Sequence, residues 1–326
     1  MILLAAILLA AILLAQSIPG AAWEERSPSQ AGLSREKLDA LREQAGGRGC
    51  VVRGGALVYS WGDVSRSVDV ESAGAPVLTA LLMRAVQEGR VAGPDARVSD
   101  VQPGLAGKDA TITWRHLACG LSGVGREESP GAAWSPDGAG AALFYDALIG
   151  KVYAQPGTDV LRRGLADPLG FQDSCAFDAG VKKGEPGRLR ISARDFARFG
   201  LLMLRGGEWG TARVLLASLS YLSLSAPVSA DQPRSGGRTG PGPGYLSFGW
   251  WVNGIDDRRR QLFVDGPADL VAALGLGGRH ALWILPSLDL VVSWNDSVLG
   301  DLDRSPGSAD AALNRAVRRM AESAAP

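Results

Sequence analysis

The segment VVRGGALVYSWGD, residues 51–63, is followed after a short connection by DVESAGAPVLTALLMRAVQEGRVAGPDARVSD, residues 69–100. The first stretch has two short apolar runs around a Gly-Gly pair, a pattern that predicts a β-hairpin. In the second stretch, residues 77–88 are apolar on nearly every side, which predicts a buried helix. Ser72 stands just before this helix, so we expect the helix to begin close to its hydroxyl.

Further helices and strands flank these two stretches on both sides. Ser34 is a good N-cap for a helix that a pair of glycines closes. Residues 225–244 are rich in Pro, Gly and Ser and predict a long loop. Helices are expected over 113–119, 139–153, 192–205 and 309–323, and strands within 245–253, 261–264, 269–274, 280–286 and 288–295. This order predicts an α+β fold, with an antiparallel sheet shared by both ends of the chain, flanked by terminal helices, and with an inserted helical subdomain.

Composition and charge exclude several functions. The chain has 326 residues, of which 46 % are hydrophobic and 21 % charged, as in an ordinary folded protein. Lys plus Arg, 34, equals Asp plus Glu, 34, so there is no net charge to attract nucleic acid or an anionic membrane. We find no clustered metal ligands, phosphate loop or dinucleotide fingerprint, and we expect no metal and no cofactor.

The first residues are typical of an export signal. Residues 2–15, ILLAAILLAAILLA, form an unbroken apolar run that is too short for the roughly 20 residues of a membrane-spanning helix. Small residues at Gly20 and Ala22 suit a signal peptidase, which predicts cleavage before Trp23. We therefore expect a signal peptide over residues 1–22, one domain over 23–326, and an exported, periplasmic or secreted protein. A leader that is not cleaved would tether the protein to the membrane.

The three cysteines, Cys50, Cys119 and Cys175, do not form a disulfide framework. Their positions have no metal-type spacing, and at most one pair could bridge. We expect all three to be small buried hydrophobic residues. The sequence does not determine the oligomeric state.

Five segments in order resemble the serine β-lactamases and penicillin-binding-protein-like hydrolases, in particular the class C and esterase-like branch. The first is the hairpin with the 69–100 stretch quoted above. The others are TWRHLACGLSGV at 113–124, PGAAWSPDGAGAALFYDAL at 130–148, GRLRISARDFARFGLLMLRGGEW at 187–209 and GLGGRHALWILPSLDLVVSW at 275–294. The resemblance covers roughly residues 35–320 and implies the β-lactamase/transpeptidase-like fold.

The nucleophile motif of this family is incomplete here. The family places Ser-x-x-Lys at the start of the buried helix, where the lysine amine takes the serine proton. The matching residues are Ser72-Ala73-Gly74-Ala75, so the serine is present and an alanine replaces the lysine. Ser72 is the candidate nucleophile, and the alternative interpretation is that it serves only as a helix N-cap.

The second and third motifs are depleted as well. Where the family has the tyrosine of Tyr-x-Asn, this chain has Pro136, which cannot transfer a proton. The third motif keeps Gly275, Gly277 and Gly278, which are candidates for the groove edge and for an oxyanion-binding amide. A tight turn leading into a strand is the alternative for these glycines.

The sequence therefore predicts a serine-hydrolase-like protein with impaired catalysis. Such a protein would bind a peptide, an ester, a cell-wall fragment or a protein partner in the former active-site groove. The alternative is an active esterase, amidase or peptidase that uses Ser72 with an unrecognised base. For the two histidines, we expect His116 to have a structural role, whereas His280 could point either into the groove or out of the sheet.

Overall fold

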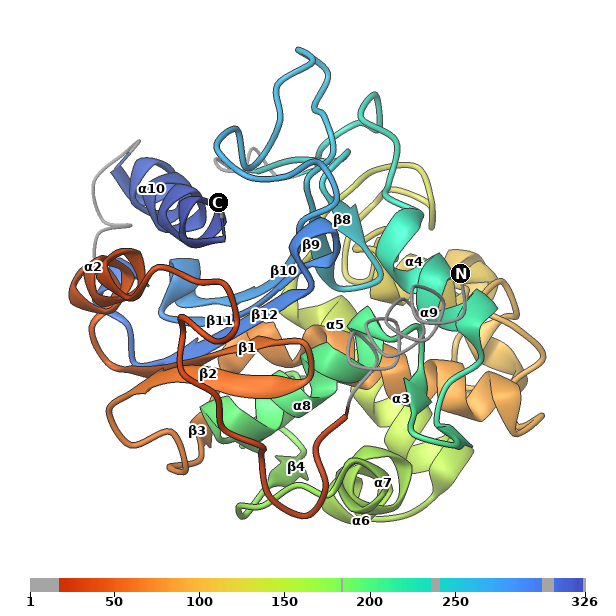
Figure 1. Ribbon diagram of the computed structural model, residues 1–326. Helices are drawn as coiled ribbons and strands as arrows, with labels where there is room; N and C mark the ends of the chain where they lie inside the picture. The colour runs from red at the N-terminus through yellow and green to blue at the C-terminus, as the bar shows by residue number, and fades with distance from the viewer. Residues whose placement is uncertain (1–17, 183, 236–240, 301–307, 325–326) are drawn as a thin grey trace, which may run out of the picture.

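The computed structural model describes residues 18–182, 184–235, 241–300 and 308–324 (Figure 1). Of the leader predicted for residues 1–22, residues 1–17 thus lie outside the described residues. No helix within the described ranges is long and apolar enough to cross a membrane.

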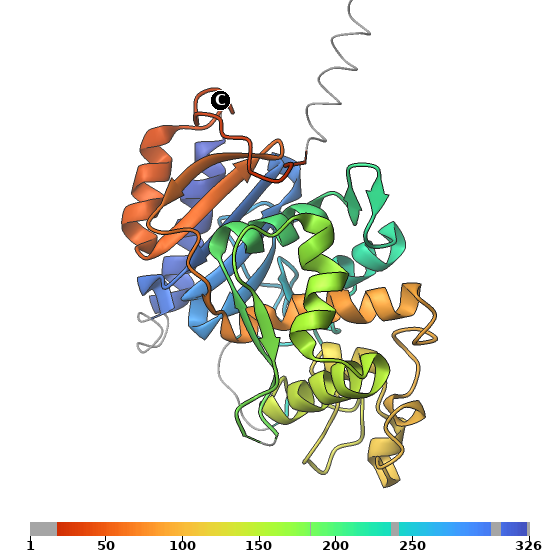
Figure 2. The same ribbon diagram turned by 90° about the horizontal axis from the view of Figure 1, so that it is seen from below.

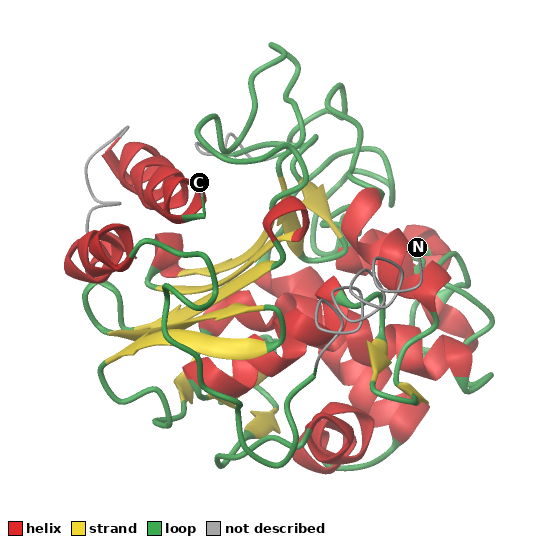
Figure 3. Cartoon of the chain, viewed as in Figure 1, coloured by secondary structure: helices red, strands yellow, loops and turns green. Residues whose placement is uncertain are grey.

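A seven-stranded antiparallel sheet joins the two ends of the chain (Figures 1 and 3). The N-terminal hairpin pairs with the last strand in a continuous register, for example Val51 with Val292. The predicted sheet shared by both chain ends is confirmed. In order across the sheet, the strands are β2 Ala56–Trp61, β1 Arg48–Arg53, β12 Leu290–Asn295, β11 His280–Leu285, β10 Val271–Gly275, β9 Trp250–Val252 and β8 Leu246–Ser247.

Both faces of the sheet are buried, and alternate residues of each strand enter different cores. Along β11, Leu282 and Ile284 pack into one hydrophobic cluster, whereas Ala281 and Trp283 pack into the other. This alternation follows from the period of two residues in a strand. On one face the sheet packs against α2 (Arg35–Ala45) and α10 (Ser308–Ser323), and on the other face against α8 (Ala193–Leu204).

The helical subdomain is inserted between the N-terminal hairpin and the C-terminal strands, as predicted (Figure 2). It begins with a 3₁₀ turn, η1 (Glu71–Gly74), that leads into the buried helix α3 (Ala75–Gln87). Its other helical elements are η2 Val98–Asp100, η3 Gly107–Thr111, α4 Trp114–Ala118, α5 Gly138–Ala147, η4 Leu148–Tyr153, α6 Gly157–Leu161, η5 Arg162–Ala166, α7 Asp167–Leu169 and α9 Ala217–Ser225. Its short strands are β3 Val68–Asp69, β4 Ala176–Asp178, β5 Arg188–Ile191, β6 Glu208–Trp209 and β7 Ala212–Arg213.

Two strand predictions differ from the structure. Residues 261–264 form no strand and contribute only an isolated bridge between Gln261 and Ile255. The run 245–253 is broken into β8 and β9 by Phe248 and Gly249, whose φ angles are +46° and +86°. A Cβ at Gly249 would lie 3.0 Å from the Ala75 carbonyl carbon, so the glycine lets this sheet edge approach the start of α3.

All three cysteines are free thiols, and the expected burial is confirmed for two of them. Cys50 and Cys119 are buried and Cys175 is partly buried. Burial raises the pKa of Cys50 to about 12, so this thiol is not a nucleophile near neutral pH.

Candidate functional site

Ser72 lies in the 3₁₀ turn that precedes α3, and its side chain is exposed. Glu71 has a φ of +53°, which is rare for a residue other than glycine, and the Asp69 carboxylate accepts its N–H at 2.9 Å. The N-cap of α3 is Gly74, and no side chain caps the helix. The interpretation of Ser72 as an N-cap is therefore wrong, because Gly74 occupies the N-cap position, two residues after Ser72.

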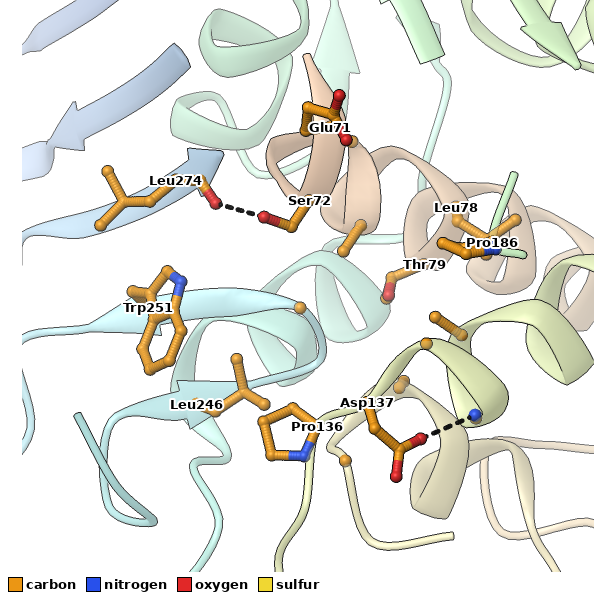
Figure 4. A pocket seen from close by; sticks show the side chains of 18 of the residues that line it. Glu71, Ser72, Leu78, Thr79, Pro136, Asp137, Pro186, Leu246, Trp251 and Leu274 are labelled. Carbon is orange, nitrogen blue, oxygen red and sulfur yellow. Dashed lines mark hydrogen bonds between the residues drawn. The ribbon is translucent and has the colours of Figure 1, made fainter. Parts of the chain in front are cut away.

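The Ser72 hydroxyl instead donates to the main-chain carbonyl of Leu274 in β10, at 3.1 Å (Figure 4). Strand β9 pairs only with Val271 and Ala272, so the later residues of β10 present an open edge toward η1. A residue in a strand has its N–H and C=O on the same side, so the Leu274 N–H also faces this edge. Gly275 allows the approach, since a Cβ there would lie 2.3 Å from the Val70 carbonyl oxygen.

A cavity of about 640 Å³ opens beside Ser72, between the sheet edge and the helical subdomain (Figure 4). Ser72, Ala75 and Thr79 line one wall along η1 and α3, and Pro136 and Asp137 line another. Most of the remaining wall is apolar or aromatic: Leu78, Leu117, Trp134, Phe144, Phe177, Pro186, Leu246, Trp251, Leu262, Phe263, Leu274, Leu276 and Leu313. Its volume is in the range of cavities that enclose small organic ligands.

No Lys, His, Tyr or Cys is among the described residues that line this cavity. Ala75 and Pro136 both face it, as the resemblance implied for the residues that replace the base and the phenol. The titratable residues in the described wall are Asp69, Glu71, Asp137 and Arg188.

Each of these titratable side chains already has a polar partner. Arg188 binds both Asp69 and Glu71, the latter at 3.0 Å from its Nη2. The Asp69 hydrogen bond raises the pKa of Arg188 further above its ordinary value. Asp137 binds Arg126 at 3.0 Å and caps α5 by accepting the Gly140 N–H at 3.0 Å. Figure 4 shows the Glu71 side chain directed away from the Ser72 hydroxyl. None of these groups is therefore placed as a base for Ser72.

Neither histidine lines the cavity. His116 Nδ1 accepts the Thr113 N–H at 3.2 Å and completes a capping box at the start of α4, the structural role expected for it. His280 is buried in β11, with its Nδ1 3.2 Å from the Asn295 side-chain oxygen. Burial lowers the pKa of both histidines.

The three motif glycines occupy different positions. Gly277 lines the cavity together with Leu276. Gly275 packs against the η1 turn, as described above. Gly278 packs against Leu313 of α10, and its carbonyl accepts the Trp294 indole N–H at 2.7 Å. The residue that contacts Ser72 is Leu274, which immediately precedes the glycine run.

Sequence reasoning missed several wall residues, among them Leu274, Thr79 and Arg188. Leu274 acts through its main chain, which leaves no signal in the residue type. Thr79 could have been found, because it lies four residues after Ala75 and therefore on the same face of the helix. Arg188 comes from a distant strand, and only the fold brings it to Asp69.

A serine at the start of a buried helix, an antiparallel sheet edge beside it and a cavity between them define the serine-hydrolase class of β-lactamase-like proteins. The Beta-lactamase family model matches residues 36–295, and the chain belongs to that family. A search of curated proteins finds no match.

Solved structures agree on the fold. A penicillin-binding-protein homologue from Caulobacter crescentus is 15 % identical with a TM-score of 0.65, covering 89 % of this chain and 98 % of its own. A class C β-lactamase from Rhodobacter sphaeroides is 16 % identical with a TM-score of 0.61, covering 90 % and 99 %. EstCE1, a hydrolase with promiscuous acyltransferase activity, is 16 % identical with a TM-score of 0.63, covering 89 % of this chain and 99 % of its own.

Proposed function

We propose that this protein is a catalytically impaired member of the β-lactamase family whose cavity binds a small ligand without turning it over. One observation carries the proposal: the described cavity wall has no Lys, His or Tyr to take the proton of the Ser72 hydroxyl, which donates to a main-chain carbonyl instead. A serine hydroxyl that lacks an adjacent base is a weak nucleophile at neutral pH. In serine proteases the loss of such a base lowers turnover by about 10⁴–10⁶.

A second candidate function is an active esterase, amidase or peptidase that uses Ser72 with a base outside the described wall. The position of Ser72 favours it, because the hydroxyl is exposed beside the open edge of β10. The Leu274 N–H at this edge is suited to stabilise an oxyanion.

Restoring the missing groups separates the two candidates. We expect the wild type to hydrolyse p-nitrophenyl butyrate no faster than Ser72→Ala. The double variant Ala75→Lys/Pro136→Tyr should gain hydrolysis that a further Ser72→Ala change abolishes, because the lysine supplies a base one helical turn from Ser72. The matched control is Ala75→Met/Pro136→Phe, which adds similar volume without a titratable group and should remain inactive. Wild-type hydrolysis that disappears in Ser72→Ala would contradict impaired catalysis.

A further inference from the structure

The described cavity wall carries more acidic than basic side chains. Its one cation among the described residues is Arg188, and that guanidinium binds the carboxylates of Asp69 and Glu71. Asp137 adds a third carboxylate to the wall, paired with Arg126. A carboxylate that entered this cavity would meet acidic groups and a guanidinium that is already engaged. Burying a charge without a partner is costly, so an anion is disfavoured here.

The helix wall offers a neutral polar group instead. Thr79 is 1 % exposed, and its hydroxyl makes no hydrogen bond to the described residues. Figure 4 shows this hydroxyl on the side of α3 that faces the cavity, on the same wall as Ser72. A buried hydroxyl without a partner is destabilising, and a ligand carbonyl or N–H would satisfy it.

We propose that the cavity is selective for a neutral ligand in which an amide or ester group is attached to an apolar or aromatic body, and that it rejects carboxylates. The aromatic and leucine side chains of the wall would enclose the apolar body, while Thr79 would bind the amide or ester group. This inference rests on the proposed function only in placing the ligand in the same cavity.

Three probes of matched size test the selectivity: 4-phenylbutanamide, 4-phenylbutanoate and 4-phenylbutylamine, titrated at pH 7 by calorimetry. The amide should bind, and the carboxylate should bind at least tenfold more weakly. The amine should bind no more weakly than the carboxylate, because the wall is acidic. Equal binding of amide and carboxylate, or no binding of the amide at millimolar concentration, would overturn the inference.

Two variants locate the cause of the selectivity. Leu276 is 53 % exposed at the cavity rim, so Leu276→Lys adds an ammonium group without changing the core. Compared with the uncharged control Leu276→Met, Leu276→Lys should strengthen binding of the carboxylate several-fold relative to binding of the amide. Thr79→Val replaces the hydroxyl with a methyl group of similar size and should weaken amide binding about fivefold, whereas Thr79→Ser should retain it. A lysine that does not improve carboxylate binding would show that charge does not set the selectivity.

These binding measurements are independent of turnover. Hydrolysis by the wild type would refute impaired catalysis without affecting the ligand preference. Indifference to ligand charge would refute the preference while leaving impaired catalysis intact.

A second inference comes from Arg198, a residue of α8 that is completely buried. Its guanidinium donates to three carbonyl oxygens: Gly20 at 3.0 Å, Ala21 at 3.3 Å and Leu169 at 2.8 Å. The guanidinium carbon also lies 5.0 Å from the centre of the Trp23 ring. Two of the three acceptors for this buried charge thus precede the cleavage position expected from the sequence.

We infer that the mature protein keeps residues 18–22, and that cleavage before Trp23 does not occur. A chain beginning at Trp23 would lose both N-terminal carbonyls as acceptors for Arg198 and would add a positive charge at its new N-terminus. The loss of acceptors is unfavourable, because the Arg198 side chain itself is buried.

Export of the full chain in a Gram-negative host, followed by N-terminal sequencing and intact-mass measurement, tests this inference. The chain should begin at Ile18 or earlier, and a mature chain beginning at Trp23 would overturn it. As a second measurement, chains starting at Ile18 and at Trp23 are compared by thermal unfolding. The Trp23 chain should unfold at a lower temperature, and equal melting temperatures would count against the inference.

Discussion

The Ser72 hydroxyl donates its one proton to the Leu274 carbonyl, at the point where the β10 edge meets the η1 turn. Ala75 lies on the same wall, at the position where the family has the lysine that serves as a base. A methyl group fills little of the space of a lysine side chain, which accounts for an open and apolar cavity at this point. The proposal of impaired catalysis therefore rests on two positions, Ala75 and Pro136, whose side chains cannot transfer a proton.

The contact between Gly275 and the η1 turn gives a prediction for a single residue. Gly275→Ala would put a methyl group 2.3 Å from the Val70 carbonyl oxygen, so the strand or the turn must move. We expect a loss of about 1–3 kcal/mol in the free energy of unfolding, measured by guanidinium denaturation. The control is Gly93→Ala, where a Cβ meets nothing within 4 Å and stability should be nearly unchanged. Equal effects of the two substitutions would mean that the close approach is not real.

Among the elements, α8 joins the sheet to the helical subdomain through polar groups at its buried start. Ser192 caps the helix by accepting the Asp195 N–H at 3.2 Å. The Asp195 carboxylate in turn accepts the N–H groups of Gln172 and Asp173, each at 2.8 Å. Burial raises the pKa of Asp195, although these hydrogen bonds favour its charged form.

The two polar residues at the start of α8 should differ in their effect on stability. Ser192→Ala removes one capping hydrogen bond and should cost about 1 kcal/mol. Asp195→Ala leaves two N–H groups without their acceptor and should cost more, at about 1–3 kcal/mol for each group that stays unsatisfied. Asp195→Asn keeps one acceptor oxygen and should fall between the wild type and Asp195→Ala. Denaturation midpoints measure all three variants, and an Asp195→Ala cost no larger than that of Ser192→Ala would contradict this account.

Helices and strands with a clear hydrophobic period were predictable from the sequence, whereas the contacts between these elements were not. The hairpin followed from Gly54-Gly55, and α8 from its serine cap and amphipathic pattern. Residues 261–264 have the composition of a strand, but apart from the isolated bridge between Gln261 and Ile255 no described strand pairs with them. The tertiary arrangement therefore overrides their local preference. The same holds at the site: Ser72, Ala75 and Pro136 were found by motif, but the partnership of Ser72 with Leu274 depends on main-chain geometry that only the folded sheet edge provides.

At the scale of the whole molecule, the two histidines connect folding to pH. Burial lowers the pKa of both below the value in an unfolded chain. The unfolded state therefore binds more protons as the pH falls below about 6.5, which is the ordinary histidine pKa. The stability contributed by the neutral histidines is complete above that pH and is lost as the pH falls toward their lowered pKa values.

We therefore expect the melting temperature to be lower at pH 5.5 than at pH 7.5. The double variant His116→Gln/His280→Gln should show a smaller difference, since glutamine keeps hydrogen-bonding capacity without titrating in this range. Glutamine also suits the capping-box position of His116. An unchanged pH dependence in the double variant would assign the effect to other groups.

The central claim is that Ser72 has no group to activate it, and covalent labelling tests this most directly. The wild type and Ser72→Ala are incubated with a fluorophosphonate or a penicillin-type probe, and adducts are located by intact-mass measurement and peptide mapping. The account predicts no adduct on Ser72 and equal, negligible labelling of both proteins. Stoichiometric modification of Ser72 within minutes, absent in Ser72→Ala, would contradict it.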